Sequence, residues 1–446
     1  MKRQFFGFLL LLSFVFNVSA QKAQVANADA VEQNLRKHIE YLASDKLEGR
    51  RTGEAGATAA AGYIANQFAR LHLKPGVHAA NGKATYLQPF PGKAAAPDKP
   101  VTGYNIIGIL DGKDRILRNE AIVIGAHYDH LGHGGEGSLA PNSKDVHHGA
   151  DDNASGTAAI IELARQFAKA KNNKRTIIFI AFSGEEEGLF GSKYYVNNPV
   201  FPIENTVAMI NLDMVGRLKD DKITIGGIGT ASEWKSIVEA ENKEKHNETQ
   251  TGNGRNGSDI TLDVTVTKPF NLALNEDGFG PSDHSSFYTK KIPVLFFFTG
   301  THLDYHKPSD TADKINYEGE AKVISYVAAI VKSVDQNAVK PTYAVAKSSG
   351  TPGGGRTGFS VTLGTIPSYT DSTDGMVIDG VRDASPAAKA GLKANDKIVK
   401  LAGQDINNVQ DYTKILGDLK ADVEYEIVII RGSERLTLKI TPAKRQ

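Results

Sequence analysis

Short apolar runs alternate with amphipathic stretches over most of the chain, and this alternation predicts its secondary structure. Five runs have the length of buried strands: Asn105–Leu110, Ala121–Ala126, Thr176–Phe182, Val207–Leu212 and Pro293–Phe298. Apolar residues at helical spacing fill Gly156–Ala170 and Tyr317–Val334. Largely apolar strands that alternate with helices predict an α/β fold, in which helices sandwich a mixed, mostly parallel sheet.

The margins of this α/β region show other patterns. Apolar residues recur at helical spacing twice between Asp29 and Leu73, on either side of a turn-rich link at Leu47–Gly53. The polar stretch Glu241–Asp259 breaks the alternation and predicts a loop or an insertion. We expect this first domain to extend over residues 21–340.

A change of composition predicts a second domain. Residues 347–358 are rich in serine and glycine, which is typical of a linker. We expect the linker over residues 341–358 and a small α+β domain over residues 359–446. Its predicted strands are Phe359–Leu363, Gly375–Asp379, Lys397–Leu401, Glu424–Ile430 and Leu436–Ile440, and its predicted helices are Ser385–Lys389 and Val409–Leu419.

The amino-acid composition limits which partners and which metal ligands can be expected. The 52 basic and 51 acidic residues nearly balance, so no electrostatic argument favours a nucleic acid or an anionic membrane surface as a partner. The chain has no cysteine, which excludes disulfides and thiolate metal ligands. Any metal must be held by His, Asp and Glu, a ligand set that suits zinc, manganese or cobalt.

The N-terminus has the pattern of a secretory signal peptide. Lys2 and Arg3 precede a mostly apolar run at Phe5–Phe16, and the small residues of Val18–Ala20 follow it. The run is too short to span a bilayer stably, although a short membrane anchor is the alternative interpretation. We therefore predict a signal peptide at residues 1–20 and an exported protein, periplasmic or extracellular, without a membrane anchor after cleavage.

Chemically active side chains gather where the predicted strands end. His127, Glu186 and Asp213 each come within a few residues of a strand's carboxyl end, and His306 follows the last strand after a short loop. Asp152 stands at the entry of the helix Gly156–Ala170. Because open α/β sheets bind ligands beyond the carboxyl ends of their strands, we expect these side chains to converge.

Two imidazoles and three carboxylates can hold two divalent ions if one carboxylate bridges them. Asp129 has the spacing of a carboxylate that orients the imidazole of His127. Glu185 and Glu186 are adjacent, so one can bind metal while the other acts as general base. Each feature also has a structural interpretation, such as a helix cap at Asp151–Asn153 or a solvated acidic run at Glu185–Glu187. A purely structural explanation of the whole pattern would require all of these separate interpretations to be true at once.

Five ordered motifs give the chain a resemblance to the M28 family of zinc peptidases over about residues 30–334. They are Gly125–Asp129, Gly149–Gly156, Gly184–Ser192, Asn211–Gly216 and Tyr305–Thr311. The resemblance implies a zinc-exopeptidase fold and two zinc ions per chain. It assigns His127 and Asp213 to one zinc, Glu186 and His306 to the other, and Asp152 to both, with a cis peptide before Asn153.

The same resemblance implies the catalytic roles. Glu185 would be the general base and later the acid, Asp129 would orient His127, and Tyr305 would donate to the developing oxyanion. The triple glutamate leaves another register open, in which Glu186 is the base and Glu187 the ligand. The spacing to Gly188 favours the first assignment.

Other histidines lie near these motifs. The Ser282–His284 motif also resembles the family, and His284 is either substrate-binding or structural. We expect the loop histidines His130, His133, His147 and His148 to line the pocket without binding metal. Lys307–Pro308 departs from many family members and leaves the pocket beside His306 open to interpretation.

The C-terminal domain resembles a bacterial PDZ domain. The resemblance rests on Gly375–Ile378, Ser385–Leu392 and Asp396–Gly403. It implies capture of an extended peptide or a C-terminus by strand addition, in a groove between Phe359–Leu363 and the helix that begins at Val409. The alternative is a module that only stabilises or docks.

These features together predict a metallo-aminopeptidase that hydrolyses peptides with a free N-terminus. The rivals on the same fold are a glutaminyl cyclase, which in this family works with one metal, and a carboxypeptidase. A rival of another class is a non-catalytic PDZ binding protein, which a lost ligand would indicate. None of the five ligand positions is missing.

Overall fold

The structure is a computed structural model of the whole chain. It describes residues 30–79, 81–93, 100–135, 137–140, 142–243, 269–346, 361–367, 374–382, 384–407 and 409–444. The predicted signal peptide, most of the predicted loop at Glu241–Asp259 and the serine- and glycine-rich part of the linker lie outside the described residues.

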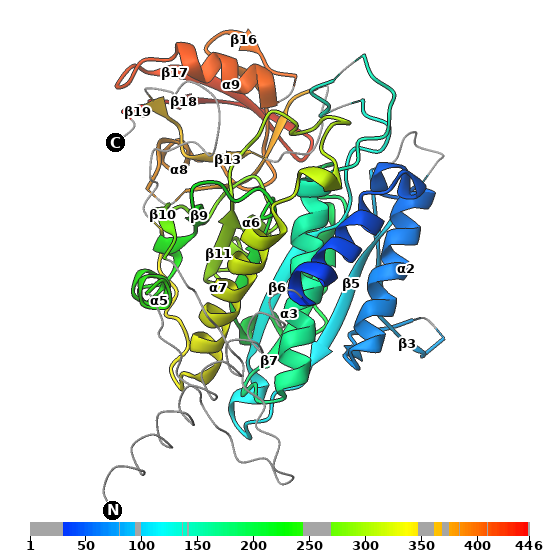
Figure 1. The fold of residues 1–446 in the computed structure, drawn as a ribbon. Helices are drawn as coiled ribbons and strands as arrows, with labels where there is room; N and C mark the ends of the chain where they lie inside the picture. The colour runs from blue at the N-terminus through cyan, green and yellow to red at the C-terminus, as the bar shows by residue number, and fades with distance from the viewer. Residues whose placement is uncertain are drawn as a thin grey trace, which may run out of the picture.

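A central sheet organises the first domain (Figure 1). Its strand order is β1-β5-β7-β6-β8-β11-β9-β10, with β4 paired to β5. The strands are β1 (Lys74–Pro75), β4 (Leu87–Pro91), β5 (Thr102–Leu110), β6 (Ala121–His127), β7 (Thr176–Phe182), β8 (Thr206–Leu212), β9 (Lys222–Gly226), β10 (Asn271–Leu274) and β11 (Val294–Phe298). The central strands β7, β6, β8 and β11 are parallel, whereas β5 and β9 join them antiparallel. The mixed α/β sheet predicted from the sequence is confirmed.

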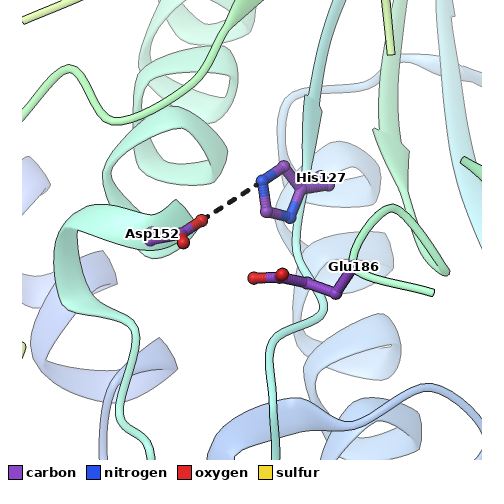
Figure 2. A group of neighbouring side chains, drawn as sticks. All are labelled: His127, Asp152 and Glu186. Atoms are coloured by element: carbon purple, nitrogen blue, oxygen red, sulfur yellow. Dashed lines mark ion pairs between the residues drawn. The ribbon is translucent and has the colours of Figure 1, made fainter. Parts of the chain in front are cut away.

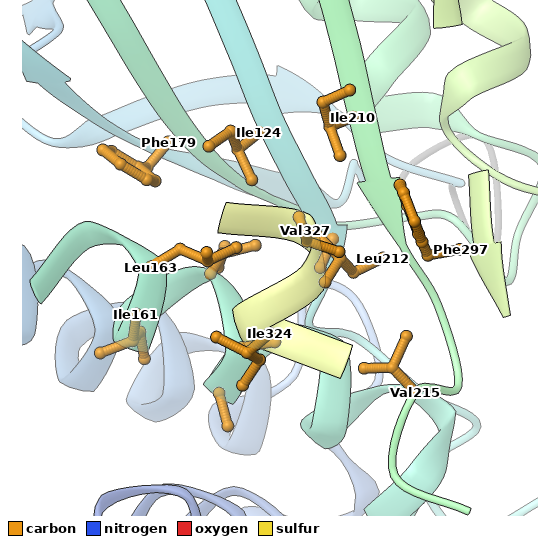
Figure 3. Packing of buried hydrophobic residues seen from close by; sticks show 14 of the residues in the cluster. Ile124, Ile161, Leu163, Phe179, Ile210, Leu212, Val215, Phe297, Ile324 and Val327 are labelled. Carbon is orange, nitrogen blue, oxygen red and sulfur yellow. The ribbon is translucent and has the colours of Figure 1, made fainter. Parts of the chain in front are cut away.

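Helices cover both faces of the sheet because successive strand residues point in opposite directions. On one face, Ile122 and Ile124 of β6 pack in a cluster with α2 (Ala55–Arg70), α3 (Gly156–Ala170) and α7 (Tyr317–Gln336). Figure 3 shows residues of α3 and α7 against this face of the sheet. On the other face, Val123 packs in a second cluster with residues of α4 (Phe190–Asn197) and α6 (His284–Tyr288).

Shorter elements complete the first domain. Residues 30–42 form a helix before α2. The remaining elements are η1 (Asp45–Arg50), β2 (Val77–His78), β3 (Ala84–Thr85), η2 (Leu117–Asn119), η3 (Ala150–Ser155), η4 (Ile203–Asn205), η5 (Ile228–Thr230), α5 (Trp234–Glu241) and η6 (Ala312–Lys314). Among the described residues, no helix has both the length and the apolar character needed to cross a membrane.

The C-terminal domain is built on a second, antiparallel sheet with the order β13-β14-β15-β17-β18, with β16 paired to β15. Its elements are β12 (Val361–Thr362), β13 (Thr365–Pro367), β14 (Met376–Val381), α8 (Pro386–Lys389), β15 (Lys397–Leu401), β16 (Gln404–Asp405), α9 (Val409–Asp418), β17 (Tyr425–Arg431), β18 (Glu434–Ile440) and β19 (Ala443–Lys444). The five strands and two helices expected here are all present, within the described residues. β13 was not predicted. β12 pairs with β19, whereas β13 is one of the two edge strands of the second sheet and β18 is the other.

One buried acid in the core gives a prediction about stability. Glu320 of α7 is fully buried, and neither carboxylate oxygen has a hydrogen-bond partner among the described residues. Burial, with Asp151 nearby, raises the pKa of this carboxyl well above its ordinary value. Folded protein therefore holds a proton that unfolded chain releases above a pKa of about 4.3.

The stability due to this proton is complete below the unfolded pKa and is lost as pH rises through the folded pKa. We expect Glu320→Gln to remove that loss, which amounts to at most about 1.4 kcal/mol per pH unit. Chemical denaturation from pH 5 upward measures it. Glu318→Gln, on the exposed side of α7 beside Lys322, is the matched control. A parallel pH profile for Glu320→Gln and wild type would contradict the expectation.

Candidate metal centre

The predicted ligands converge at one end of the central sheet, although they are far apart in sequence. His127 is the last residue of β6, Asp213 directly follows β8, and Glu186 lies in the loop after β7. Asp152 lies in η3, immediately before α3, and His306 lies in the loop between β11 and α7. All five side chains are largely withdrawn from solvent.

Asp152 stands between the two histidines. Its Oδ1 lies 3.4 Å from Nε2 of His127, and its Oδ2 lies 3.2 Å from Nε2 of His306. Asp213 Oδ1 is 3.4 Å from the same nitrogen of His127, and Glu186 Oε2 is 3.2 Å from that of His306. The result is two sets of three ligand atoms that share one carboxylate, as the family resemblance implies.

These spacings fit zinc. A tetrahedral zinc with bonds of about 2.0–2.1 Å holds its ligand atoms roughly 3.3 Å apart. The four separations from the two histidine nitrogens are 3.2–3.4 Å. In Figure 2, His127, Asp152 and Glu186 face a common space from three different elements. Their ligand atoms all lie within 4.8 Å of one another.

The backbone around Asp152 has the geometry that the resemblance implies. The peptide bond between Asp152 and Asn153 is cis. Asn153 accepts hydrogen bonds from the backbone N–H groups of Gly156 and Met214 and donates one to the carbonyl of Leu212. These bonds tie the turn of Asp152 to the segment that carries Asp213.

The three consecutive glutamates point to different partners. Glu186 faces the histidines, whereas Glu187 Oε1 lies 3.4 Å from Nε of Arg51. Glu185 Oε2 lies 4.0 Å from Nε2 of His127. Its ligand atom also falls within 4.8 Å of those of His127 and Asp213. Glu185 therefore lies beside the ligand set, as a proton acceptor should, and Glu187 lies outside it.

Asp129 and Tyr305 each contact a histidine of the predicted ligand set. Asp129 places its backbone oxygen 3.2 Å and its Oδ1 3.7 Å from Nδ1 of His127, so its carbonyl makes the closer contact. Its carboxylate accepts hydrogen bonds from Thr52 and from the backbone of Glu185. Tyr305 stacks on His306 with ring centroids 3.8 Å apart and lines the cavity at the metal cluster.

His284 is more enclosed than a substrate-binding residue needs to be. It is 1% exposed, stacks on Phe296 and lines the cavity. Burial lowers the pKa of His284 to about 3, so the ring is neutral at physiological pH. Its position is compatible with either role proposed for it, as an apolar wall or a substrate contact.

Two residues come closer to the site than sequence reasoning expected. His130, predicted as a pocket wall, places Nδ1 2.7 Å from Glu186 Oε1 and 3.9 Å from Asp152 Oδ2. Arg50 is completely buried and donates to the carbonyls of Tyr128, His148 and Gly149. Arg50 thus joins the segments that carry His127 and Asp152. Little in the sequence signals either contact, because Arg50 is a basic residue in a turn-rich link and His130 is a loop histidine.

The site has an excess of buried negative charge. Although burial lowers the pKa of His127, Asp213 and Glu185 raise it well above its ordinary value. Although burial raises the pKa of Glu186, His306 and His130 hold it well below its usual range. Burial raises the pKa of Glu185 well above its usual range. Cations that displace the histidine protons would neutralise this cluster.

Asp310 holds the turn of Asp152 and gives a second prediction. Its Oδ2 accepts from the backbone N–H groups of Asp151 and Asp152, at 2.8 and 3.1 Å, and its Oδ1 accepts from Arg217 at 3.2 Å. Both carboxylate oxygens of Asp310 accept hydrogen bonds, whereas an asparagine side chain at this position would have only one acceptor oxygen. We expect Asp310→Asn to weaken metal binding by about 10- to 100-fold, which is the usual effect of losing a residue that orients a ligand.

Chelator competition followed by mass spectrometry of bound metal measures this effect. Asp304→Asn is the matched control, because Asp304 also accepts from Arg217 at 3.2 Å, whereas its other hydrogen bonds are to Ser309 and Lys314 and not to the Asp152 turn. Equal metal affinity in the two variants would contradict a positioning role for Asp310.

Comparisons with known proteins agree with this geometry. A sequence profile described as peptidase family M28 matches residues 105–331, which is more than half of the chain. The chain belongs to peptidase family M28. A PDZ-domain profile matches residues 363–441 of this M28 protein. Both resemblances drawn from the sequence are confirmed.

Several relatives of the M28 protein carry peptidase names. Aminopeptidase YwaD of Bacillus subtilis is 29% identical over 251 residues, which are 54% of this chain and 46% of that protein. The chain spans 38% to 55% of the length of the first curated relatives that it matches. These relatives are zinc metalloproteases or a leupeptin-inactivating enzyme by name.

Two solved structures share the fold. A Zn-dependent exopeptidase from Parabacteroides distasonis aligns with a TM-score of 0.51 and 19% identity, over 68% of this chain and 97% of that one. A glutaminyl cyclase from Porphyromonas gingivalis aligns with a TM-score of 0.51 and 18% identity, over 69% and 98%. Because both chemistries occur on this fold, the site residues must decide between them.

Proposed function

We propose that this M28 protein is an exported di-zinc aminopeptidase that releases N-terminal residues from peptides. The observation that carries the proposal is the position of Asp152, whose two carboxylate oxygens face different histidines. A carboxylate shared by two sets of nitrogen and oxygen ligands suits a pair of zinc ions.

His127 and Asp213 would hold one zinc, Glu186 and His306 the other, and Asp152 both. When bound, two zinc ions supply polarisation of the peptide carbonyl and acidify water. Glu185 accepts the proton of the attacking water and returns it to the leaving amine. Tyr305 donates a hydrogen bond to the carbonyl oxygen as negative charge develops there.

The preference for N-termini rests on the metal pair. Two bound zinc ions would offset the charge of the four carboxylates of Asp152, Glu185, Glu186 and Asp213, which line the cavity. An unprotonated α-amino group is a nitrogen ligand that the metal pair would accept, whereas an N-acetylated terminus offers no such ligand. The name of the Bacillus subtilis relative agrees with this preference.

Export is a separate part of the proposal. It is supported by the basic, apolar and small-residue pattern of residues 1–20. N-terminal sequencing of the protein recovered from cell fractions tests it. A mature chain that begins near Gln21 in the periplasm or the medium is expected, whereas an intact N-terminus in the cytoplasm would refute export.

One experiment tests the activity against its rivals. Zinc per chain is measured together with the products from matched peptides that have free, N-acetylated or glutaminyl N-termini. Two zinc ions and cleavage of free N-termini alone are expected. One zinc and cyclisation of the glutaminyl peptide would indicate a glutaminyl cyclase, and release of C-terminal residues would indicate a carboxypeptidase. Metal-loaded protein that leaves every peptide intact would indicate a non-catalytic binding protein.

A further inference from the structure

The cavity at the metal centre extends into the PDZ domain. Its volume is about 1230 Å³, and its walls include the five predicted metal ligands. The same cavity is lined by residues 361–365, Arg382, Tyr412 and Leu416 of the PDZ domain. Figure 1 shows the PDZ domain beside β9 and β10 of the central sheet. One ligand can therefore contact both domains at once.

A partly buried contact holds the PDZ domain in this position. The guanidinium of Arg382 donates to both carboxylate oxygens of Asp277, at 2.9 and 2.7 Å, and lies 5.2 Å from the ring centroid of Phe279. Bidentate pairs of this kind fix orientation as well as adding energy. The backbone N–H of Arg382 donates to the carbonyl of Gly364. Arg382 thus joins the turn at the cavity wall to the peptidase domain.

The PDZ wall has the features of a peptide-binding groove. β13 is an edge strand, so its outer backbone groups are available for strand addition. The hydroxyl groups of Thr365 and Tyr412 lie 2.6 Å apart and connect β13 to α9. Tyr412 and the half-buried Leu416 add apolar surface beside this strand. The extended main chain of a peptide would pair with β13, and an apolar side chain of the peptide would pack on Tyr412 and Leu416.

The walls of the cavity carry charges of both signs. Four carboxylates belong to the metal centre, and a fifth, that of Asp277, is paired with Arg382. The wall also carries the basic side chains of Lys193, Lys222 and Lys290. Basic side chains on the cavity wall complement the free C-terminal carboxylate of a peptide.

We propose that the two domains bind one short peptide by both of its ends, with its N-terminus at the metal centre and its C-terminal residue in the PDZ groove. The inference rests on the proposed aminopeptidase function and names its substrate class. Such peptides are the products of endopeptidases, which leave a free carboxylate. Peptide length is then a determinant of specificity, because each extended residue adds only about 3.3 Å of reach.

A length series tests the proposal. The zinc-loaded full chain is given an aminoacyl p-nitroanilide, which has a single residue, and peptides with the same N-terminal residue and lengths up to about ten residues, roughly 33 Å extended. Each peptide is made with a free and with an amidated C-terminus. We expect kcat/KM to pass through a maximum with length. At that length, amidation should lower kcat/KM about tenfold, the effect of losing one charge-assisted contact.

Two variants locate the effect in the PDZ domain. Leu416→Glu places a carboxylate beside the C-terminal residue of the peptide, and Arg382→Ala removes the contact with Asp277. Both should abolish the preference for the free C-terminus. The matched controls are Val423→Glu, at an exposed apolar residue, and Arg435→Ala, at an exposed arginine on β18; neither residue is among those lining the cavity. Circular dichroism verifies that each variant is folded.

The outcomes separate this inference from the proposed function. Turnover of the anilide with no effect of peptide length or amidation would overturn two-ended binding and leave the aminopeptidase intact. Failure to hydrolyse the anilide and every peptide would overturn the aminopeptidase. In that case, binding of fluorescent peptides to zinc-loaded Glu185→Gln still tests the inference. Affinity that falls on acetylation and falls also on amidation supports it, and affinity unchanged by amidation refutes it.

Discussion

Replacing Glu185 by glutamine is expected to lower kcat by about 10²- to 10⁴-fold and to leave both metals bound. Glutamine has nearly the same shape but cannot take a proton from water. The Glu185 carboxylate lies 4.0 Å from Nε2 of His127, beyond the 3.2–3.4 Å separations of the predicted ligand pairs. Steady-state kinetics on a peptide with a free N-terminus, together with metal analysis of the same sample, measure both effects.

Glu187→Gln is the matched control for this variant. Glu187 is two residues further along the same loop, and its partner is Arg51. Its replacement should leave kcat within a few-fold of wild type. Loss of metal from Glu185→Gln would show that Glu185 is itself a ligand, which its proximity to His127 and Asp213 makes a specific alternative.

Replacing Asp152 by asparagine is expected to reduce the binding of both metals together. A neutral amide offers one oxygen where two carboxylate oxygens face two histidines. Loss of a residue that only orients a ligand lowers metal affinity by about 10- to 100-fold. Loss of a shared ligand should lower the affinity by at least as much at each of the two metal sites. Titration with a competing chelator measures the two affinities, and activity should fall in proportion to bound metal.

Asp145→Asn is the matched control for Asp152. Asp145 lies in the same connection between β6 and α3, is exposed, and accepts a hydrogen bond from Ser143. It should keep wild-type metal content. If Asp152→Asn lost one metal and bound the other with unchanged affinity, Asp152 would be a terminal ligand and the bridging assignment would be wrong.

The fold was largely predictable where the apolar pattern is regular. β7 and β15 have the bounds expected from the sequence, and α3 does as well, because each is a regular element with an unambiguous apolar pattern. The short elements β9, β10, β13, α4 and α6 were not predicted. Their apolar residues are too few to show a period, and their conformation depends on what packs against them.

The site shows the same division. Strand-end positions and family motifs are sufficient to predict His127, Glu186 and Asp213 as ligands. The approach of His130 to Glu186 was missed, as was the burial of Arg50 among backbone carbonyls. Both contacts depend on how loops fold back over the strand ends, and loop paths leave little periodic trace in a sequence.

The sequence by itself determined the family, the α/β class and the set of side chains able to bind metal. The pattern of apolar residues and the order and spacing of the motifs are local properties of the chain and can be identified without the structure. Only the tertiary structure decided that Asp152 turns one oxygen to each histidine, and that the PDZ domain shares a cavity with the peptidase domain. These relations join residues that are up to 289 positions apart, from His127 to Leu416. Packing across the whole fold sets such distances, and no local pattern encodes them.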